Sequence, residues 1–361
     1  MIPFLDLKPG VDAADVRAAI DRVIERGWFV LGPELEAFEN EFAAACQAPH
    51  AVGVGTGTDA LALALRALGV GPGDEVITSP LSAAYSALAI MMAGARPVFA
   101  DIDPDRLTID PRAAEGAVTP RTKAIMPVHL YGQSADMPAL MEVAARHRLL
   151  VVEDCCQSHL ATCGGKPVGS FGAAAAYSFY PTKNLGALGD GGAVTTADAD
   201  LAARLKRLRN GGQTATYQHA EFGVNSRLDE MQAAILRARL AWLPRWTAER
   251  RALAAEYRRR LAGAAVTVPA ERDAGHVYHL FPVLTRDRAA LRAHLEARGV
   301  QTLVHYPIPI PRQPALASEQ PAQCPIADRV CGEVLSLPLH PGMTAQAVEE
   351  VATALHAAPA P

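Results

Sequence analysis

Short apolar runs that alternate with helical stretches constrain the fold of this chain more than any other feature. The apolar runs, rich in Val, Ile, Leu and Ala, stand at 50–54, 75–79, 97–101, 123–129 and 149–154. Residues with helical spacing fill the intervals at 83–93, 111–117 and 137–147. Unbroken apolar strands separated by helices are typical of a mostly parallel sheet with helices on both faces. We therefore expect an α/β fold whose ligand site lies beyond the carboxyl ends of the strands.

The length of 361 residues is enough for two domains. We expect a large domain over 1–243 that carries an N-terminal arm, and a smaller C-terminal α+β domain over 244–361. The boundary is placed at Pro244, between helical stretches at 227–242 and 247–261. Apolar β runs at 277–284 and 301–306 and helical stretches at 288–298 and 345–356 make up the second domain.

Composition excludes several classes of protein. The net charge of −4 argues against a nucleic-acid-binding surface. The arginine-rich stretches 204–209 and 250–260 have helical spacing, and we interpret them as solvated helix faces. The most apolar run, 81–95, is too short to span a bilayer, and the first residues do not read as a signal peptide. Six cysteines, two of them adjacent, and eleven histidines without metal-ligand spacing indicate reduced thiols, a cytoplasmic protein and no metal site.

One lysine stands alone in a glycine-rich segment. The stretch 178–192 reads Ser-Phe-Tyr-Pro-Thr-Lys-Asn-Leu-Gly-Ala-Leu-Gly-Asp-Gly-Gly, and Lys183 is the only Lys or Arg between Lys166 and Arg204. Small residues let other backbone or a flat ligand come close. Desolvation there would lower the pKa of the amine and make it a nucleophile toward a carbonyl. An exposed loop lysine is the alternative.

Two further segments have the chemistry of ligand sites. After the run at 50–54, Gly-Thr-Gly-Thr-Asp (55–59) precedes an apolar helix over 60–68, and such a turn presents free N–H groups to an anion. The alternative is an ordinary helix capped by Thr58 or Asp59. Asp154 ends the run 149–154, where a buried carboxylate needs a partner such as a protonated ring nitrogen, unless it caps a helix.

With these segments in place, the sequence closely resembles the sugar aminotransferases of the DegT/DnrJ/EryC1/StrS family. The matching segments begin with Gly-Trp-Phe-Val-Leu-Gly-Pro-Glu-Leu-Glu-Ala-Phe-Glu (27–39), the turn at 55–61 and Val-Glu-Asp-Cys-Cys-Gln-Ser-His (152–159). They continue through Gly-Ser-Phe-Gly (169–172), the lysine segment, 223–234 and Ser-Leu-Pro-Leu-His-Pro-Gly-Met (336–343). The resemblance implies the aspartate-aminotransferase fold (fold type I) and the cofactor pyridoxal 5′-phosphate.

The resemblance also assigns roles to residues. Lys183 would bind the cofactor's aldehyde as a Schiff base and then move the proton, and Asp154 would pair with the pyridinium nitrogen. Gln157 would hydrogen-bond the ring's 3′-oxygen, while Thr58, Asp59 and Ser178 would hold the phosphate. Asn225 matches a residue that reaches the phosphate from the neighbouring subunit, which implies an obligate homodimer.

The sequence departs from the family at two places. Ala83 stands where relatives commonly have an aromatic residue over the cofactor ring, and Tyr85 is our candidate for that role. In the segment 305–315, Pro311 stands where relatives usually have histidine, and the following Arg312 is a candidate for contact with a phosphate or carboxylate.

These features predict an enzyme that moves the amino group of L-glutamate or L-glutamine onto a nucleotide-linked keto-deoxyhexose. Such enzymes belong to amino-sugar biosynthesis. Relatives that act as sugar dehydratases have histidine in place of the lysine, so Lys183 argues against that activity. An enzyme that makes an aromatic amine, as in aminohydroxybenzoate synthesis, is one alternative. A non-catalytic regulator on the same fold is the other.

Overall fold

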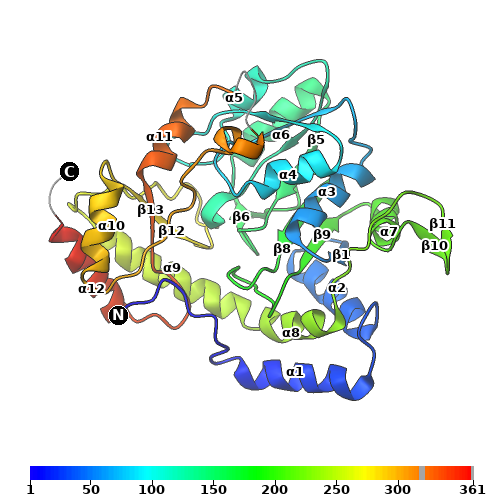
Figure 1. Ribbon diagram of the computed structural model, residues 1–361, viewed down its shortest axis with the longest axis horizontal. Helices are drawn as coiled ribbons and strands as arrows, with labels where there is room; N and C mark the ends of the chain where they lie inside the picture. The colour runs from blue at the N-terminus through cyan, green and yellow to red at the C-terminus, as the bar shows by residue number, and fades with distance from the viewer. Residues whose placement is uncertain (317–321, 359–361) are drawn as a thin grey trace.

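The computed structural model describes residues 1–316 and 322–358 (Figure 1). Its α-helices are α1 (Ala13–Arg26), α2 (Pro33–Ala45), α3 (Gly57–Ala67), α4 (Tyr85–Met92), α5 (Pro111–Gly116), α6 (Met137–His147), α7 (Ala199–Leu208), α8 (Glu230–Leu240), α9 (Leu243–Arg260), α10 (Arg288–Glu296), α11 (Pro325–Glu333) and α12 (Ala345–His356). Short 3₁₀ helices lie at Leu130–Gly132, Ile310–Arg312 and Pro314–Leu316. The strands are β1 (His50–Val54), β2 (Glu75–Thr78), β3 (Arg96–Phe99), β4 (Thr122–Met126), β5 (Leu150–Asp154), β6 (Thr162–Cys163), β7 (Lys166–Pro167), β8 (Ala174–Ser178), β9 (Gly192–Thr196), β10 (Gln213–Ala215), β11 (Gln218–His219), β12 (Phe281–Leu284) and β13 (Val334–Leu337).

A seven-stranded sheet in the order β1-β9-β8-β5-β4-β2-β3 forms the centre of the larger lobe. The strand pairs from β8 to β3 are parallel, and β9 runs antiparallel to both of its neighbours. The expected α/β architecture with a mostly parallel sheet is therefore confirmed.

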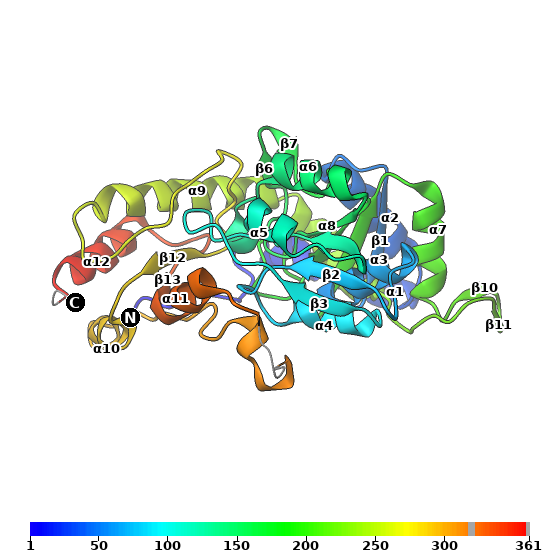
Figure 2. The ribbon, with the colours of Figure 1, turned by 90° about the horizontal axis from the view of Figure 1, so that it is seen from above.

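Alternate residues of the strands enter two apolar cores, because successive side chains of a strand point to opposite faces. Ile77, Ile125 and Val151 pack with α2, α5 and α6 on one face. Val76 and Val152 pack with α3, α4 and α7 on the other. Helices thus cover both faces of the sheet (Figure 2), which explains why its strands are apolar without alternation.

The C-terminal lobe has an apolar core of its own, built on α9, α10, α12 and the antiparallel pair β12–β13. The chain's first residues also lie in this lobe, where Ile2 forms a bridge with Val300 (Figure 1). The boundary between 243 and 244 stays a prediction, although α9 begins at Leu243. Pro244 does not separate two helices, since it occupies the first turn of α9, where the missing N–H is not needed.

Two expectations are wrong, and two elements of the C-terminal lobe are not predicted from the sequence. Residues 301–306 do not form a strand but only a single bridge, Leu303 to Ser336, because the prolines that follow cannot continue a ladder. The missed strand is β13, which follows the missed helix α11. Finally, the arginine-rich helices are not wholly solvated: Arg209 is buried against Glu39, and Arg250 is buried among backbone carbonyls.

Close backbone contact joins the lobes at Gly132. Its carbonyl accepts the N–H of Val277, and its φ is +98°. A Cβ there would lie 2.8 Å from the backbone nitrogens of Tyr278 and His279. Only glycine fits both the backbone conformation and the approach.

The β10–β11 hairpin projects from the end of the molecule opposite to the C-terminal lobe (Figure 2). Among the described residues, none of the helices is both long and apolar enough to cross a membrane.

Candidate active site

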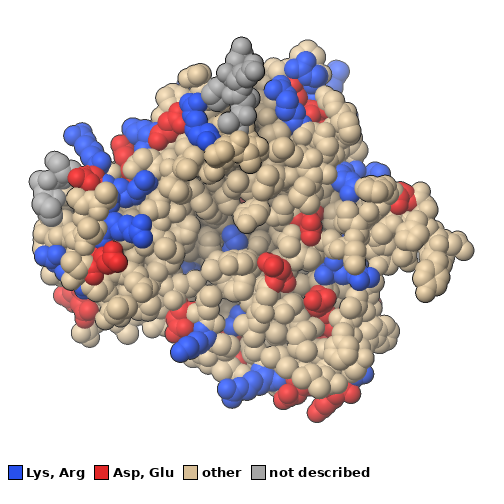
Figure 3. Space-filling view, viewed as in Figure 1, with Lys and Arg blue, Asp and Glu red and all other residues tan. Residues whose placement is uncertain are grey.

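Polar side chains converge at the carboxyl edge of the sheet, where the segments after β2, β4, β5 and β8 meet. Asp154 is the last residue of β5, and Ser178 is the last residue of β8. The face shown in Figure 3 is hollowed near its centre, with lysine or arginine atoms visible in the hollow. The carboxyl edge is the place at which an open α/β sheet binds its ligands.

The turn before α3 differs from the expected helix cap. The helix begins at Gly57 rather than at residue 60, and the capping residue is Thr56, whose Oγ1 accepts the Asp59 N–H at 3.0 Å. The Thr58 hydroxyl is therefore not used as a cap. A Cβ on Gly57 would lie 2.6 Å from the Ser178 Cβ and 3.0 Å from the Cys156 Sγ. Glycine thus allows the start of α3 to lie directly against the end of β8.

Asp59 and Asn225 lie beside this turn, in contact with different parts of the chain. The Asp59 carboxylate accepts the Ser226 hydroxyl at 2.8 Å, and the same Ser226 oxygen accepts the Gly55 N–H at 2.9 Å. Asp59 therefore fixes the turn through Ser226. Asn225 is exposed, and its backbone forms an antiparallel bridge with Asn210.

Asp154 is buried and has two hydrogen-bond donors. Its Oδ2 accepts the Ser86 hydroxyl at 2.9 Å, and its Oδ1 accepts the Cys156 N–H at 3.1 Å. Ser86 lies in the first turn of α4 and is one of the residues that sequence reasoning missed. These donors hold the carboxylate at the end of β5 and leave it without a cationic partner among the described residues.

Gln157 is held by two tyrosines. Its Oε1 accepts the Tyr131 N–H at 2.8 Å, and its Nε2 donates to the Tyr306 hydroxyl at 3.0 Å. Burial raises the pKa of Tyr306, and the charges of Asp154, Cys156 and Tyr85 add to this effect. Tyr85 itself is 62% exposed at the start of α4, which leaves its ring free to contact a ligand.

Lys183 is half-buried in the loop after β8, so it is not the exposed loop lysine of the alternative interpretation. Its backbone N–H donates to the Tyr180 carbonyl at 2.8 Å, which forms a tight turn. Burial lowers the pKa of its amine, although Cys156 and Asp154 oppose that effect. The amine has no hydrogen bond or ion pair with residues 1–316 or 322–358.

Two buried histidines, His159 and His279, and the half-buried His305 lie near enough to Lys183 for its charge to act on them, and all three are uncharged at neutral pH. Burial, with a smaller contribution from the charge of Lys183, lowers the pKa of His159 to about 3 and that of His305 to about 4. The pKa of His279 is also lowered, by burial and then by Lys183 and Arg250. Neither ring nitrogen of His159 has a hydrogen-bond partner in the described part of the chain. With these histidines uncharged, the Lys183 amine, whose pKa is lowered by burial, is the basic group of this cluster.

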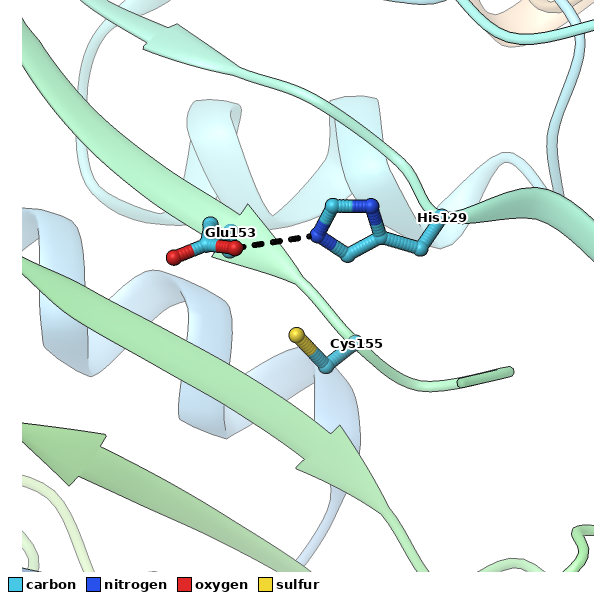
Figure 4. A group of neighbouring side chains, drawn as sticks. All are labelled: His129, Glu153 and Cys155. Carbon is cyan, nitrogen blue, oxygen red and sulfur yellow. Dashed lines mark hydrogen bonds and ion pairs between the residues drawn. The ribbon is translucent and has the colours of Figure 1, made fainter. Parts of the chain in front are cut away.

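A second polar cluster, formed by His129, Glu153 and Cys155 at the end of β5, has a structural role (Figure 4). The His129 Nδ1 accepts the Ala135 N–H at 3.0 Å, so Nε2 carries the proton and donates to Glu153 at 3.1 Å. Glu153 also accepts the N–H groups of Gly169, Phe171 and Gly172.

The third member of this cluster is Cys155, and the three ligand atoms lie within 4.8 Å of one another. Burial raises the pKa of the Cys155 thiol, so the thiol stays protonated. Because the Glu153 oxygens already accept four hydrogen bonds, we assign this cluster a structural role rather than metal binding.

The segment at which this chain departs from the family lies against the carboxyl edge. Ile310 donates its N–H to the Pro80 carbonyl at 2.8 Å, and Pro311 is buried. Arg312 pairs with Asp328 at 3.1 Å, so its carboxylate partner belongs to this chain.

Sequence reasoning missed the residues that support the site from a distance. The sequence did offer a signal for Tyr306, because this residue stands in the His-Tyr-Pro segment that was compared with the family. Ser86 had no signal, since an apolar helix surrounds it. The burial of Arg250 and His279 depends on how the lobes pack, which no local pattern reveals.

Comparison with known proteins agrees with this geometry. The model of the DegT/DnrJ/EryC1/StrS aminotransferase family matches residues 11–356. A Streptomyces venezuelae protein named dTDP-3-amino-3,4,6-trideoxy-alpha-D-glucose transaminase is 52% identical over 349 residues, which cover 94% of this chain and 91% of the relative. An Aneurinibacillus thermoaerophilus protein named dTDP-3-amino-3,6-dideoxy-alpha-D-galactopyranose transaminase is 46% identical over 360 residues, 99% of each chain.

Solved structures are similar over almost the whole chain. The crystal structure of S. venezuelae DesV in complex with a ketimine intermediate has a TM-score of 0.96 and 50% identity, and the match covers 98% of this chain and 97% of that one. The crystal structure of NtdA from Bacillus subtilis with bound cofactor PMP has a TM-score of 0.93 and 34% identity, with 98% and 84% covered.

Proposed function

The chain belongs to the DegT/DnrJ/EryC1/StrS aminotransferase family as a sugar aminotransferase that uses pyridoxal 5′-phosphate, and we propose that it aminates C3 of a nucleotide-linked 3-keto-deoxyhexose. The amino donor in this proposal is L-glutamate or L-glutamine. Position 3 is supported by the names of both curated relatives described above, each of which is a transaminase of a dTDP-linked 3-aminosugar. Those names do not favour the aromatic-amine or regulator alternatives.

The residues at the carboxyl edge fit the cofactor. A lysine amine with a lowered pKa, a buried carboxylate without a cationic partner in the described part of the chain and a helix N-terminus with a free hydroxyl are what its aldehyde, ring nitrogen and phosphate require. In the proposed arrangement Thr58 and Ser178 bind the phosphate, with Asp59 fixing the turn. Gln157 donates to the ring oxygen, and Tyr85 covers the ring.

The observation that carries the proposal is that Lys183 and Asp154 lie close enough at one edge of the sheet for the Asp154 charge to act on the lysine amine. When bound, the cofactor supplies an electron sink for the carbon that loses its proton. Lys183 takes up and returns that proton at Nζ, and its lowered pKa keeps the amine in the basic form nearer to neutral pH. Asp154, held by Ser86 and the Cys156 N–H, keeps the ring nitrogen protonated.

A labelled product tests the position of amination. The purified protein is incubated with ¹⁵N-labelled L-glutamate and a dTDP-linked 3-keto-6-deoxyhexose, and the product is examined by NMR. The expected result is ¹⁵N bonded to C3. Label at C4 when a 4-keto sugar is offered, with none at C3 from the 3-keto sugar, would contradict the assignment.

We further propose that the active form is a homodimer in which Asn225 completes the partner's site. Asn225 is exposed next to Ser226, which already lies against the turn at Gly55. Mixing Lys183→Ala protein with Asn225→Asp protein tests this proposal. If the site is shared, mixed dimers contain one intact site and recover activity, whereas sites built from a single chain recover none.

A further inference from the structure

Arg250 is a buried cation without an anionic partner. Its side chain is on α9 and it is only 4% exposed. Its Nη1 donates to the carbonyls of Tyr278, His279 and Leu339, at 3.2, 3.4 and 2.9 Å. Its Nε has no hydrogen-bond partner, and no carboxylate pairs with it within residues 1–316 and 322–358.

The arrangement is energetically unfavourable unless a ligand completes it. Buried charges are normally paired, because desolvation costs several kcal/mol per ion. Burial lowers the pKa of Arg250 to about 10, so the guanidinium stays charged at neutral pH. Neutral carbonyls occupy one of its nitrogens and leave the face formed by the others without an acceptor.

Two cavities border Arg250, and both lie beside the catalytic loop. One has a volume of about 410 Å³, and its lining includes Thr182, His279, His305 and Arg292. The other has about 330 Å³, and its lining includes Lys183. The larger volume is room for roughly a dozen water molecules, enough for a five-carbon dicarboxylate.

The other charges at these cavities leave Arg250 available. Arg292 is exposed and has no ion pair with described residues, and Glu296 is the acidic residue on the same wall. In the smaller cavity Asp12 pairs with Arg239, Glu249 pairs with Arg245, and the exposed Asp6 carboxylate accepts the backbone N–H of Lys8.

We propose that Arg250, assisted by Arg292, forms a binding subsite for a carboxylate of the amino donor, in the cavity beside Lys183. A guanidinium matches a carboxylate through two parallel hydrogen bonds, and a desolvated site strengthens them. The subsite rests on the proposed function in so far as the carboxylate is that of L-glutamate or L-glutamine. A phosphate of the nucleotide sugar has related chemistry, and the experiment separates the two sources.

The test is direct binding of glutarate, which has both carboxylates of glutamate but no amine to react. Calorimetric titration compares the wild type with Arg250→Lys, Arg292→Gln and Arg286→Gln. Arg286 is an exposed arginine outside both cavities, so its variant is the matched control for loss of one charge. Lysine keeps the charge at position 250 but not the two parallel bonds, so we expect binding at least about tenfold weaker.

We expect Arg292→Gln to bind glutarate a few-fold more weakly and Arg286→Gln to bind it as the wild type does. Binding of dTDP should be unchanged in all three variants. Failure of the wild type to bind glutarate would overturn the subsite, as would undiminished binding by a folded Arg250→Lys protein. If that variant does not fold, unchanged binding by Arg292→Gln overturns the subsite instead.

Weakened dTDP binding with unchanged glutarate binding would assign Arg250 to the nucleotide and overturn the proposal. The outcome for the proposed function is separate. Glutarate binding that depends on Arg250 in a protein that transfers no amino group would leave the subsite standing and end the functional proposal. Amino transfer from glutamate, together with glutarate binding that does not depend on Arg250, would overturn the subsite and leave the functional proposal standing.

Discussion

The two halves of the site differ in how completely their polar atoms are paired. On the β5 side, Asp154, Gln157 and Glu153 all have hydrogen-bond donors or acceptors within the chain. On the side formed by the lysine loop and the C-terminal lobe, the Lys183 amine and the Arg250 Nε have none among the described residues.

This difference separates scaffold from reactive surface. A paired group is fixed in direction before any ligand arrives, which suits a group that must hold a ring in one orientation. An unpaired buried group raises the free energy of the empty site, and it recovers that energy when a ligand pairs with it. We therefore propose that the β5 half positions the cofactor ring and that the lysine half reacts and binds the donor.

The largest expected effect comes from the reactive half. Lys183→Ala removes the base that moves the proton, and we expect turnover to fall by at least about 10³-fold. Because the amine contributes no hydrogen bond within the described chain, thermal unfolding should shift little. Steady-state rates and a melting curve check both expectations, and a variant that keeps its full rate would contradict the role of Lys183.

Asp154→Asn tests the fixed half at its contact with the ring. The amide keeps the size of the carboxylate but not its charge, and we expect retention of the cofactor or turnover to fall by about 10- to 100-fold. Ser86→Ala is the matched control, since it removes one donor to the same oxygen and leaves the charge in place. An Asp154→Asn enzyme with wild-type cofactor affinity and rate would remove Asp154 from the site.

Glu153→Gln tests whether the cluster of Figure 4 has a structural role. The glutamine amide would point its own N–H groups at backbone N–H groups that now donate to Glu153. We therefore expect the free energy of unfolding, measured in urea at pH 7, to fall by about 3 kcal/mol. Burial raises the pKa of Glu153, but His129 and the backbone N–H groups outweigh it and lower that pKa.

A carboxyl with a lowered pKa stabilises the fold above its ordinary value near 4.5, and that stability is lost as pH falls through the lower folded value. The stability gap between wild type and Glu153→Gln should therefore narrow in acid. A gap that stays constant from pH 7 to pH 3 would show that the charge is not the cause.

His159→Leu has the smallest expected effect and probes the uncharged histidines. With a folded pKa of about 3, His159 contributes stability above its ordinary pKa of 6.5 and loses it as pH falls below that value. Between pH 7 and pH 5 we expect the wild type to lose about 2 kcal/mol more than the variant. Equal losses in chemical denaturation would indicate that His159 takes up no proton on unfolding.

The sequence predicts the large lobe well because its signals are local. Apolar runs without alternation require a sheet covered on both faces, and the two apolar cores of this lobe lie on opposite faces of such a sheet. Asp154 could be placed at the carboxyl edge because it ends an apolar run, which forms the parallel strand β5.

The C-terminal lobe was harder to predict because its elements depend on distant partners. β13 is four residues long and exists through its pairing with β12, more than 40 residues earlier in the chain. The burial of Arg250 arises where two segments, at 278–279 and at 339, cross α9. A helical arginine with no local signal looks like a surface residue until those carbonyls are known.

The visible absorbance spectrum of the purified protein loaded with pyridoxal 5′-phosphate, taken before and after L-glutamate is added, tests the central claim most directly. We predict a yellow absorbance that depends on Lys183 and disappears when glutamate transfers its amino group. A spectrum that glutamate and glutamine both leave unchanged, or a protein that retains no cofactor, would contradict the account.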